Sequence, residues 1–376
     1  MKTFIVVGAG ILGSATAYHL VKAGANVMII DREDNGKGTD AAAGIVCPWL
    51  SQRRNQAWYQ LAKGGAKYYP DLINQLEADG QTETGYAKVG AVSLHTDEAK
   101  LDKMEERVRK RREDAPEIGE ITRLTPAETK ALFPPLADEY GSVHVSGAAR
   151  VNGRALCNAL INAAKKRGAT YIKGDAKLIH KGSHVIGVEV NDKSYYADQV
   201  IVTTGAWANE LCKPLGIDFL IEPQKAQIVH LELPETNTDK WPVVMPPTNQ
   251  YLLAFEGSRV VVGATHEDNV GYDTRVTVRG MHEIFDKALM VAPGLANSTV
   301  LETKVGFRPV APGFLPVIGA IPNFQGILVA NGLGASGLTV GPYVGAELAK
   351  LALGEETNID LKLYDVGGAI HINEDV

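Results

Sequence analysis

The sequence is short of the residues that mark several specialised protein classes. Its three cysteines, Cys47, Cys157 and Cys212, form no CxxC pair, so we expect neither a disulfide framework nor a zinc site. Lysine and arginine (38) are outnumbered by aspartate and glutamate (44), and the net charge of −6 disfavours a nucleic-acid-binding protein, which needs a basic surface. No apolar run approaches the ~20 residues that span a bilayer. These absences predict a cytoplasmic protein without a metal site, a nucleic-acid partner or a transmembrane segment.

A glycine-rich loop lies between the first apolar run and the first helical pattern. Gly8, Gly10 and Gly13 form GxGxxG, and Asp31 ends the next strand-like segment. In this motif the glycines permit a tight turn, close approach of a pyrophosphate and close packing of helix on strand. Asp31 would accept hydrogen bonds from an adenosine ribose. The pattern predicts a dinucleotide site lined by Gly8, Gly10, Ile11, Leu12, Gly13, Asp31 and Arg32.

The order of the remaining segments predicts two domains. A chain of 376 residues exceeds what one hydrophobic core usually serves. Strand–helix patterns occur at the start, middle and end, with β-rich material between them. We therefore predict an α/β fold with a discontinuous nucleotide domain (1–84, 145–219 and 305–376) and a substrate domain (85–144 and 220–304). This discontinuity favours FAD over NAD, because an NAD enzyme usually completes its nucleotide domain continuously.

Residues 97–115 form the most highly charged stretch of the chain. One interpretation is a basic binding patch. The interleaved acidic residues favour the other, a solvated helix face with i,i+4 ion pairs. Directly after it, Thr125, Pro126 and Glu128 predict a short helix that begins with a capping box.

Seven sequence blocks occur together in an order that is more specific than any one of them. They are GAGILGSATAYHL (8–20), TDAAAG (39–44), VIVTTGAW (200–207), VGAT (262–265), GFRP (306–309), LPVIG (315–319) and GLGASGLT (332–339). With them the sequence resembles the D-amino acid oxidase superfamily of FAD-dependent oxidoreductases, which includes glycine oxidase, sarcosine oxidase and D-amino acid dehydrogenases. The resemblance implies a Rossmann-like FAD-binding domain of the GR2 type and a mixed-sheet α+β substrate domain.

The resemblance also implies where noncovalent FAD would lie. The segment 42–46 would run along the flavin, and 334–339, at a helix N-terminus, would face the flavin pyrimidine oxygens, where a positive helix end stabilises negative charge. The residues implied are Ala42, Ala43, Gly44, Val46, Ala176, Thr204, Gly205, Trp207, Arg308, Gly334, Ala335, Ser336, Gly337, Leu338 and Thr339.

Three residues are candidates for substrate binding and catalysis. Arg308 matches the family position that grips a substrate carboxylate, a task that suits the bidentate guanidinium fork, although a structural ion pair is the alternative. Tyr251 would be a second carboxylate contact or a core tyrosine. His266 would touch the substrate or transfer protons, or would simply be a polar wall or surface residue.

Four other residues qualify these expectations. Arg53 and Arg54 would contact a phosphate or a second carboxylate, but a surface position is favoured. Cys47 lies outside the block in which relatives carry a cysteine-linked flavin, so the FAD should be noncovalent. Ala335 replaces an arginine of glycine oxidase, which leaves the identity of the substrate open.

The resemblance implies oxidation of an amino acid or N-alkyl amino acid, of the D-amino acid, glycine or sarcosine type. A hydride would pass from the α-carbon to flavin N5, and the electrons would go on to oxygen, a quinone or a carrier protein. One alternative is an FAD-dependent 2-hydroxy-acid dehydrogenase with His266 as base. Another is a flavin-binding subunit without independent activity. Assembly as a homo-oligomer is compatible with either function.

Overall fold

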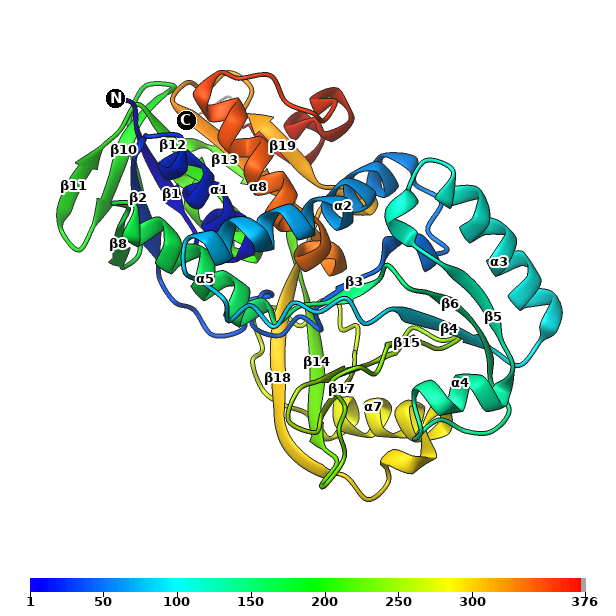
Figure 1. Cartoon of the computed structure of the whole chain (residues 1–376). Coiled ribbons are helices and arrows are strands. Elements are labelled where there is room, and N and C mark those ends of the chain that lie inside the picture. The colour runs from blue at the N-terminus through cyan, green and yellow to red at the C-terminus, as the bar shows by residue number, and fades with distance from the viewer. Residues whose placement is uncertain (373–376) are drawn as a thin grey trace.

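A computed structural model describes residues 1–372 of the chain. One part of the fold is built around a largely parallel sheet. Within the described residues, this six-stranded sheet has the order β19-β20-β12-β1-β2-β8 (Figure 1). Its strands are β1 (Thr3–Val7), β2 (Asn26–Asp31), β8 (Thr170–Lys173), β12 (Gln199–Val202), β19 (Val317–Ala320) and β20 (Ile327–Asn331). Neighbours pair in parallel except β19 with β20. The continuous apolar runs of β1, β12 and β20 are buried, as strands covered on both faces require.

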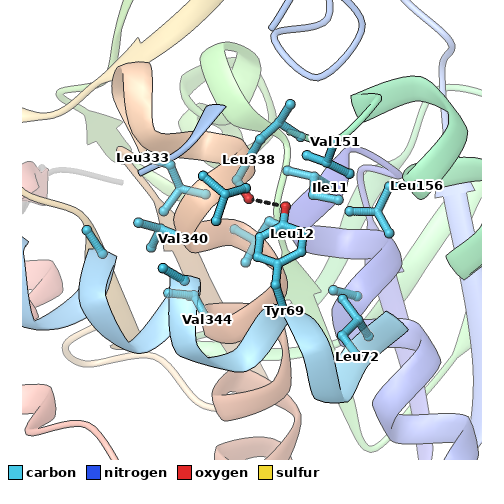
Figure 2. Close-up of a cluster of buried hydrophobic side chains, with 14 of the residues drawn as sticks. Ile11, Leu12, Tyr69, Leu72, Val151, Leu156, Leu333, Leu338, Val340 and Val344 are labelled. Atoms are coloured by element: carbon cyan, nitrogen blue, oxygen red, sulfur yellow. Dashed lines mark hydrogen bonds between the residues drawn. The ribbon is translucent and has the colours of Figure 1, made fainter. Parts of the chain in front are cut away.

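Helices cover one face of this sheet and short strands cover the other. The helices are α1 (Ile11–Lys22), α2 (Gln56–Ala78), α5 (Gly153–Lys166) and α8 (Gly337–Leu353), with α1 packed against both α5 and α8. Side chains of β1 alternate between the faces, so that Phe4 and Val6 join the helix side and Ile5 and Val7 the other. Figure 2 shows the cluster that joins α1, α2 and α8, in which the Tyr69 hydroxyl donates to the Leu338 carbonyl.

The other part of the fold is built around an eight-stranded mixed sheet with the order β18-β14-β17-β16-β15-β4-β6-β5. Its strands are β4 (Ala91–His95), β5 (Ile121–Leu124), β6 (Gly141–Val145), β14 (Glu222–Glu232), β15 (Val243–Met245), β16 (Tyr251–Phe255), β17 (Arg259–Gly263) and β18 (Thr299–Val310). The helices α3 (Glu98–Arg112), α4 (Pro126–Leu132) and α7 (Val278–Val291) pack on it (Figure 1).

Shorter elements complete the chain within the described residues. They are β3 (Ile45–Val46), β7 (Ala149–Arg150), β9 (Lys177–Lys181), β10 (His184–Val190), β11 (Lys193–Tyr196), β13 (Ile217–Phe219), β21 (Ile370–Ile372), α6 (Ala208–Cys212) and the 3₁₀ helices η1 (Pro48–Leu50), η2 (Pro116–Ile118), η3 (Gly205–Trp207), η4 (Lys213–Leu215), η5 (Pro293–Leu295), η6 (Pro312–Phe314), η7 (Gly334–Ser336), η8 (Leu361–Tyr364) and η9 (Val366–Ala369). No helix in residues 1–372 is long and apolar enough to cross a membrane.

The long antiparallel pair β14–β18 connects the eight-stranded sheet to the rest of the molecule. Gln224 of β14 lies opposite Arg308 of β18, and the pairing continues to Glu232 opposite Thr299. A β-bulge interrupts the register between His230 and Leu231. Because β18 is twelve residues long, it reaches from the outer edge of this sheet to the neighbourhood of η3 and η7.

Several sequence predictions are confirmed at the level of single elements. The capping box of α4 is present in both directions between Thr125 and Glu128. Asn152, which the sequence places before a helical pattern through Lys166, caps α5. The apolar run that indicates a strand over residues 199–204 forms a shorter one, because β12 ends at Val202. Two predicted domain boundaries, 144/145 and 304/305, fall inside β6 and β18, so the proposed division cuts two continuous strands and stays a prediction.

The charged stretch on α3 is only partly the solvated face that its composition favours. Arg109 forms the expected i,i+4 ion pair with Glu105 at 2.6 Å. Arg111, in contrast, turns inward: it stacks on the Tyr59 ring at 4.5 Å and donates to the carbonyls of Trp49 and Ser51. These carbonyls are strong acceptors beside a half-buried guanidinium, and sequence periodicity does not reveal them.

Candidate active site

One continuous cavity of about 490 Å³ runs between the N-terminus of α1 and the β16–β18 region. We call its two parts the dinucleotide end and the arginine end. Gly8, Gly10, Ile11, Leu12, Asp31 and Arg32 line the dinucleotide end. Met245, Asn249, Tyr251, His266 and Arg308 line the arginine end. The wall between them contains residues 41–45, 203–207 and 333–339.

Glycines shape the dinucleotide end where side chains would not fit. A Cβ on Gly13 would lie 1.8 Å from the Gly8 carbonyl oxygen, so this glycine allows α1 to pack against the loop. Gly8 has a φ of +97°, which only glycine adopts readily. A Cβ on Gly10 would have Thr39 Oγ1 as its nearest neighbour, at 3.3 Å, and Gly10 itself lines the cavity. The loop is therefore open on the side of the cavity and tightly packed on the other.

Charges at the dinucleotide end are paired within the protein. Asp31 accepts hydrogen bonds of 2.6 Å from the backbone N–H of Ala9, the N–H of Glu33 and the Lys37 ammonium. Arg32 forms ion pairs with three cavity-lining carboxylates, those of Asp34 (2.9 Å), Glu210 (2.8 Å) and Asp175 (3.4 Å). Asp31 thus holds the glycine loop through Ala9. Each of these charged groups has an opposite partner, although the four carboxylates outnumber the two cations.

The middle of the cavity contains the start of α8. Its first turn has no side-chain cap, so the N–H groups and the positive helix end are available to an acceptor in the cavity. A Cβ on Gly337 would meet nothing within 4 Å. Trp58 of α2 donates from Nε1 to Ser336 Oγ at 2.9 Å, and Thr339 donates to the Ile45 carbonyl at 2.8 Å. These bonds join α2, β3 and α8 around one wall.

Arg308 at the arginine end is a half-buried cation without an acidic partner within ion-pair distance among the described residues. Its Nη1 donates to Gln224 Oε1 at 3.0 Å and to the Thr265 carbonyl at 3.3 Å, both neutral acceptors. Among residues 1–372, no carboxylate lies within 4.0 Å of the guanidinium, which excludes the structural ion pair considered as the alternative. Burial lowers the pKa of Arg308 from its ordinary value. Removing a charge from water without pairing it is costly, and an anion bound in the cavity would pair this half-buried arginine, so Arg308 predicts an anionic ligand.

Tyr251 and His266 lie at the same end as Arg308. The Tyr251 hydroxyl is close to the Gly263 backbone, since a Cβ on Gly263 would lie 3.1 Å from it. Burial raises the pKa of Tyr251 to about 12, so its hydroxyl stays protonated and can donate. His266 is exposed at the mouth, and desolvation and the charge of Arg308 lower its pKa. At neutral pH His266 is therefore an uncharged base.

The family follows from the sequence match over most of this fold. Residues 3–351 match the family model described as FAD dependent oxidoreductase, DAO. The chain belongs to this family of FAD-dependent oxidoreductases. The predicted resemblance, the Rossmann-like FAD-binding architecture and the cofactor class are thereby confirmed.

Comparisons with individual members of the DAO family give the degree of similarity. An uncharacterised oxidoreductase of Bacillus subtilis, YurR, is 65% identical over 98% of this chain and 100% of its own length. The structure of iminodiacetate oxidase (IdaA) from Chelativorans sp. BNC1 is 46% identical, with a TM-score of 0.94, over 96% of this chain and 98% of that chain. Glycine oxidase of Pseudomonas aeruginosa is 28% identical over 97% of this chain and 99% of its own length.

The residues present fit the FAD that the DAO family requires. The cavity is continuous from the glycine loop at the N-terminus of α1 to the uncapped N-terminus of α8. The Ile11 N–H of α1 donates to Thr39 Oγ1 at 3.0 Å, and the other N–H groups of these two helix ends would serve a diphosphate and ring oxygens. Gly10 and Gly337 leave the space that a close-lying ligand needs. Gly8, Gly10, Ile11 and Leu12 would hold the diphosphate, and residues 42–44 and 334–339 the flavin.

Most predicted site residues lie on the wall of this one cavity. This holds for Asp31, Arg32, Ala42, Ala43, Gly44, Ala176, Thr204, Gly205, Trp207, Tyr251, His266, Arg308 and all of 334–339. Two lie outside it. Gly13 packs behind the glycine loop, and Val46 points into the core from a strand pair with Ala149. Their predicted contacts with FAD stay predictions, as do those of the others.

Sequence reasoning missed several wall residues, chiefly Ser51, Trp58, Met245 and Asn249. The sequence gives little indication that Trp58 lines a cavity, because a tryptophan near the start of an amphipathic helix is expected in the core. Cys47 also lines the cavity, and burial raises its thiol pKa to about 12. A protonated thiol is a poor nucleophile, which supports noncovalent FAD.

Arg53 does not line the cavity but lies directly behind its wall. Its guanidinium stacks on the Trp58 ring at 4.8 Å and donates to the Phe314 carbonyl. It therefore joins the loop before α2 to η6. The sequence left two positions open for Arg53, a contact with the ligand or a free surface position. The structure shows neither, because Arg53 packs behind the cavity wall.

Proposed function

We propose that this FAD-dependent oxidoreductase oxidises a small amino acid or N-alkylated amino acid at the carbon that bears the nitrogen. The observation that carries the proposal is the half-buried guanidinium of Arg308 on the wall of the FAD cavity, which has no carboxylate within ion-pair distance in residues 1–372. A substrate carboxylate would supply the missing counter-charge through a bidentate pair. The named relatives, iminodiacetate oxidase and glycine oxidase, both act on amines that carry carboxylates, and this supports the assignment.

The same end of the cavity is suited to a neutral amine. The carboxylates on the described cavity wall are Asp31 and the three partners of Arg32, all at the dinucleotide end. An ammonium group near Arg308 would meet a positive charge and no acid, so the site lowers the pKa of the substrate amine. His266, uncharged at the mouth, is placed to accept the proton. The amine lone pair can then assist departure of the hydride.

Bound FAD supplies the acceptor for that hydride. The chain's own residues contribute positioning: Arg308 and Tyr251 fix the carboxylate, and this orients the α-carbon relative to the wall formed by residues 42–44 and 334–339. No strong side-chain base is needed at the α-carbon. The arginine end offers none apart from His266 within the described residues.

Arg308→Ala tests the proposal. Removing one partner of a charge pair that is buried once the ligand is bound costs about 3–5 kcal/mol, so KM should rise by roughly 10²–10⁴-fold. The bound FAD, measured by its absorbance per protein, should be unchanged. Arg308→Lys keeps the charge but loses the fork, and an intermediate KM is expected. A wild-type KM in the alanine variant would overturn the assignment.

A substrate screen distinguishes this reaction from its alternatives. Purified enzyme would be mixed without oxygen with D- and L-amino acids, glycine, sarcosine, iminodiacetate and 2-hydroxy acids, and flavin bleaching recorded. His266 as an uncharged base keeps the 2-hydroxy-acid reaction open, and bleaching by hydroxy acids alone would favour it. Bleaching by nothing would favour a subunit without independent activity. Repeating productive reactions with oxygen and with a quinone identifies the acceptor.

A further inference from the structure

Arg308 is held in place without loss of its charge. The guanidinium uses a single nitrogen, Nη1, for both of its hydrogen bonds to the protein. The acceptors are an amide oxygen of Gln224 and a backbone carbonyl of Thr265. Both are neutral, so neither competes electrostatically with an incoming carboxylate. The remaining N–H donors of the fork have no partner in residues 1–372 and are free for a ligand.

The Gln224 amide is oriented by a second residue. Its Nε2 donates to Asp268 Oδ1 at 2.9 Å, while its Oε1 accepts from Arg308. A carboxylate can only accept hydrogen bonds and a guanidinium can only donate them. If the Gln224 amide were reversed, its NH₂ group would face the donors of Arg308 and its oxygen would face the acceptors of Asp268. Asp268 therefore fixes which end of the amide Arg308 meets. Asp268 itself lies beyond ion-pair distance of Arg308.

The segment that carries Asp268 is attached to the strand that carries Gln224. Lys225 and Glu267 exchange two backbone hydrogen bonds of 3.0 Å. Gln227 donates from its backbone N–H to Thr265 Oγ1 at 2.9 Å. Gln224 also lies opposite Arg308 in the β14–β18 register. The three side chains Asp268, Gln224 and Arg308 are thus a chain of hydrogen bonds on a rigid base.

We propose that Gln224 is a positioning residue that sets the carboxylate affinity of Arg308, with Asp268 fixing the Gln224 amide. This inference rests on the proposed function, in which Arg308 binds the substrate carboxylate. Gln224 orients the fork and leaves its charge uncompensated. The chemical requirement at position 224 is therefore an uncharged acceptor. A side chain of the same shape that carries a charge would not meet this requirement, and this distinguishes the positioning role from simple packing.

The proposal predicts an unusual order of effects at position 224. Gln224→Glu nearly preserves size, but it would place a carboxylate against Arg308 and beside Asp268. A substrate would then have to displace an internal ion pair. Gln224→Ala removes the hydrogen bond and leaves the charge free. Ligand binding should therefore suffer more from the conservative Glu variant than from Ala, although a purely structural role predicts the opposite order.

The experiment measures binding of acetate to FAD-loaded enzyme by the shift of the flavin absorbance, together with KM and kcat for a productive substrate. For acetate we expect the Kd to rise about 100-fold in Gln224→Glu, as for competition by a close buried charge pair, and about tenfold in Gln224→Ala. KM should follow Kd, while kcat and bound FAD stay near wild type. Equal binding by wild type and Glu, or weaker binding by Ala than by Glu, would overturn the proposal.

Two further variants complete the test. Asp268→Asn can donate or accept, so the Gln224 amide loses its fixed orientation, and we expect about a threefold to tenfold rise in the acetate Kd, the size of one lost neutral hydrogen bond. Asp138→Asn, which removes a surface partner of Lys130, is the matched control and should bind as wild type. Arg308→Ala separates the two hypotheses. Retained acetate binding in that variant would overturn the proposed function itself, whereas its loss with a normal Gln224→Glu would overturn only this inference.

Discussion

The two ends of the cavity handle charge in opposite ways. At the dinucleotide end Asp31 is bound by Lys37, and Arg32 by three carboxylates. At the arginine end another half-buried cation, Arg308, is held only by neutral oxygens. Charges that are paired within the protein stabilise the shape of the cavity wall, while an unpaired charge remains available to bind an oppositely charged ligand. We therefore expect the dinucleotide end to bind its ligand by shape and the arginine end to select its ligand by charge.

The largest effect should come from filling the packed side of the dinucleotide end. Gly13→Ala would place a Cβ 1.8 Å from the Gly8 oxygen, so α1 must move away from the loop. We expect loss of bound flavin and a fall in Tm, measured by absorbance and thermal unfolding. Gly368→Ala, where nothing lies within 4 Å of the new Cβ, should retain both. A fully loaded Gly13→Ala enzyme would contradict the packing argument.

Asp31→Asn should separate the two ends functionally. The change weakens charge-assisted bonds to Ala9 N–H and Lys37, each worth roughly 1.5–3 kcal/mol. We expect the Kd for FAD, measured by fluorescence titration of apoenzyme, to rise about 10–100-fold. The KM of the loaded enzyme should not change. Arg308→Ala should show the reverse pattern, and a matching loss of substrate affinity in both variants would abolish the distinction.

Arg111→Ala and Arg109→Ala compare an inward and an outward arginine of the same helix. Arg111 binds two backbone carbonyls and a ring, whereas Arg109 has one exposed ion pair. We expect the free energy of unfolding to fall by about 2–3 kcal/mol for Arg111→Ala and by less than about 0.5 kcal/mol for Arg109→Ala. Urea unfolding measures both. Equal values would mean that the inward contacts of Arg111 contribute no more to stability than an exposed ion pair.

The smallest expected effect is a pH dependence in the eight-stranded sheet. Neither ring nitrogen of His230 has a hydrogen-bond partner in residues 1–372, although Nδ1 lies 3.7 Å from Glu302 Oε1, and burial lowers the pKa of His230 to about 4. Between pH 6.5 and 4 the unfolded chain binds a proton that the folded one does not, so stability falls as pH falls. His230→Leu should remove roughly 1–2 kcal/mol of that loss between pH 6.5 and 5. Exposed His180→Leu is the control, and an unchanged pH slope in His230→Leu would contradict the argument.

The sequence predicts the parts of the fold whose causes are local. The glycine spacing, the Asn152 cap and the Thr125 capping box each depend on residues within a few positions of one another, and each has its expected place. The sequence predicts a wall residue of the cavity only where that residue belongs to a block that resembles the family. Trp58 has no such pattern, and it reaches Ser336 across 278 positions.

The pairing of Gln224 with Arg308 shows why the rest was not predictable. The two residues are 84 positions apart and meet through the register of β14 with β18. Periodicity identifies a strand but does not state which residue lies opposite which. The inward turn of Arg111 has the same origin, since its acceptors are carbonyls 60 and 62 positions away.

The bulge between His230 and Leu231 has a consequence for insertions and deletions. Side chains alternate between the faces of a strand, so a slip of one residue in β18 would turn position 308 away from the cavity. The bulge lies toward the outer end of the pair, opposite residues 300–302, and it already accommodates one unpaired residue. Length changes beyond it can be absorbed there without moving Arg308. Changes between the bulge and Arg308 cannot, so this half of the strand should not tolerate a change in length.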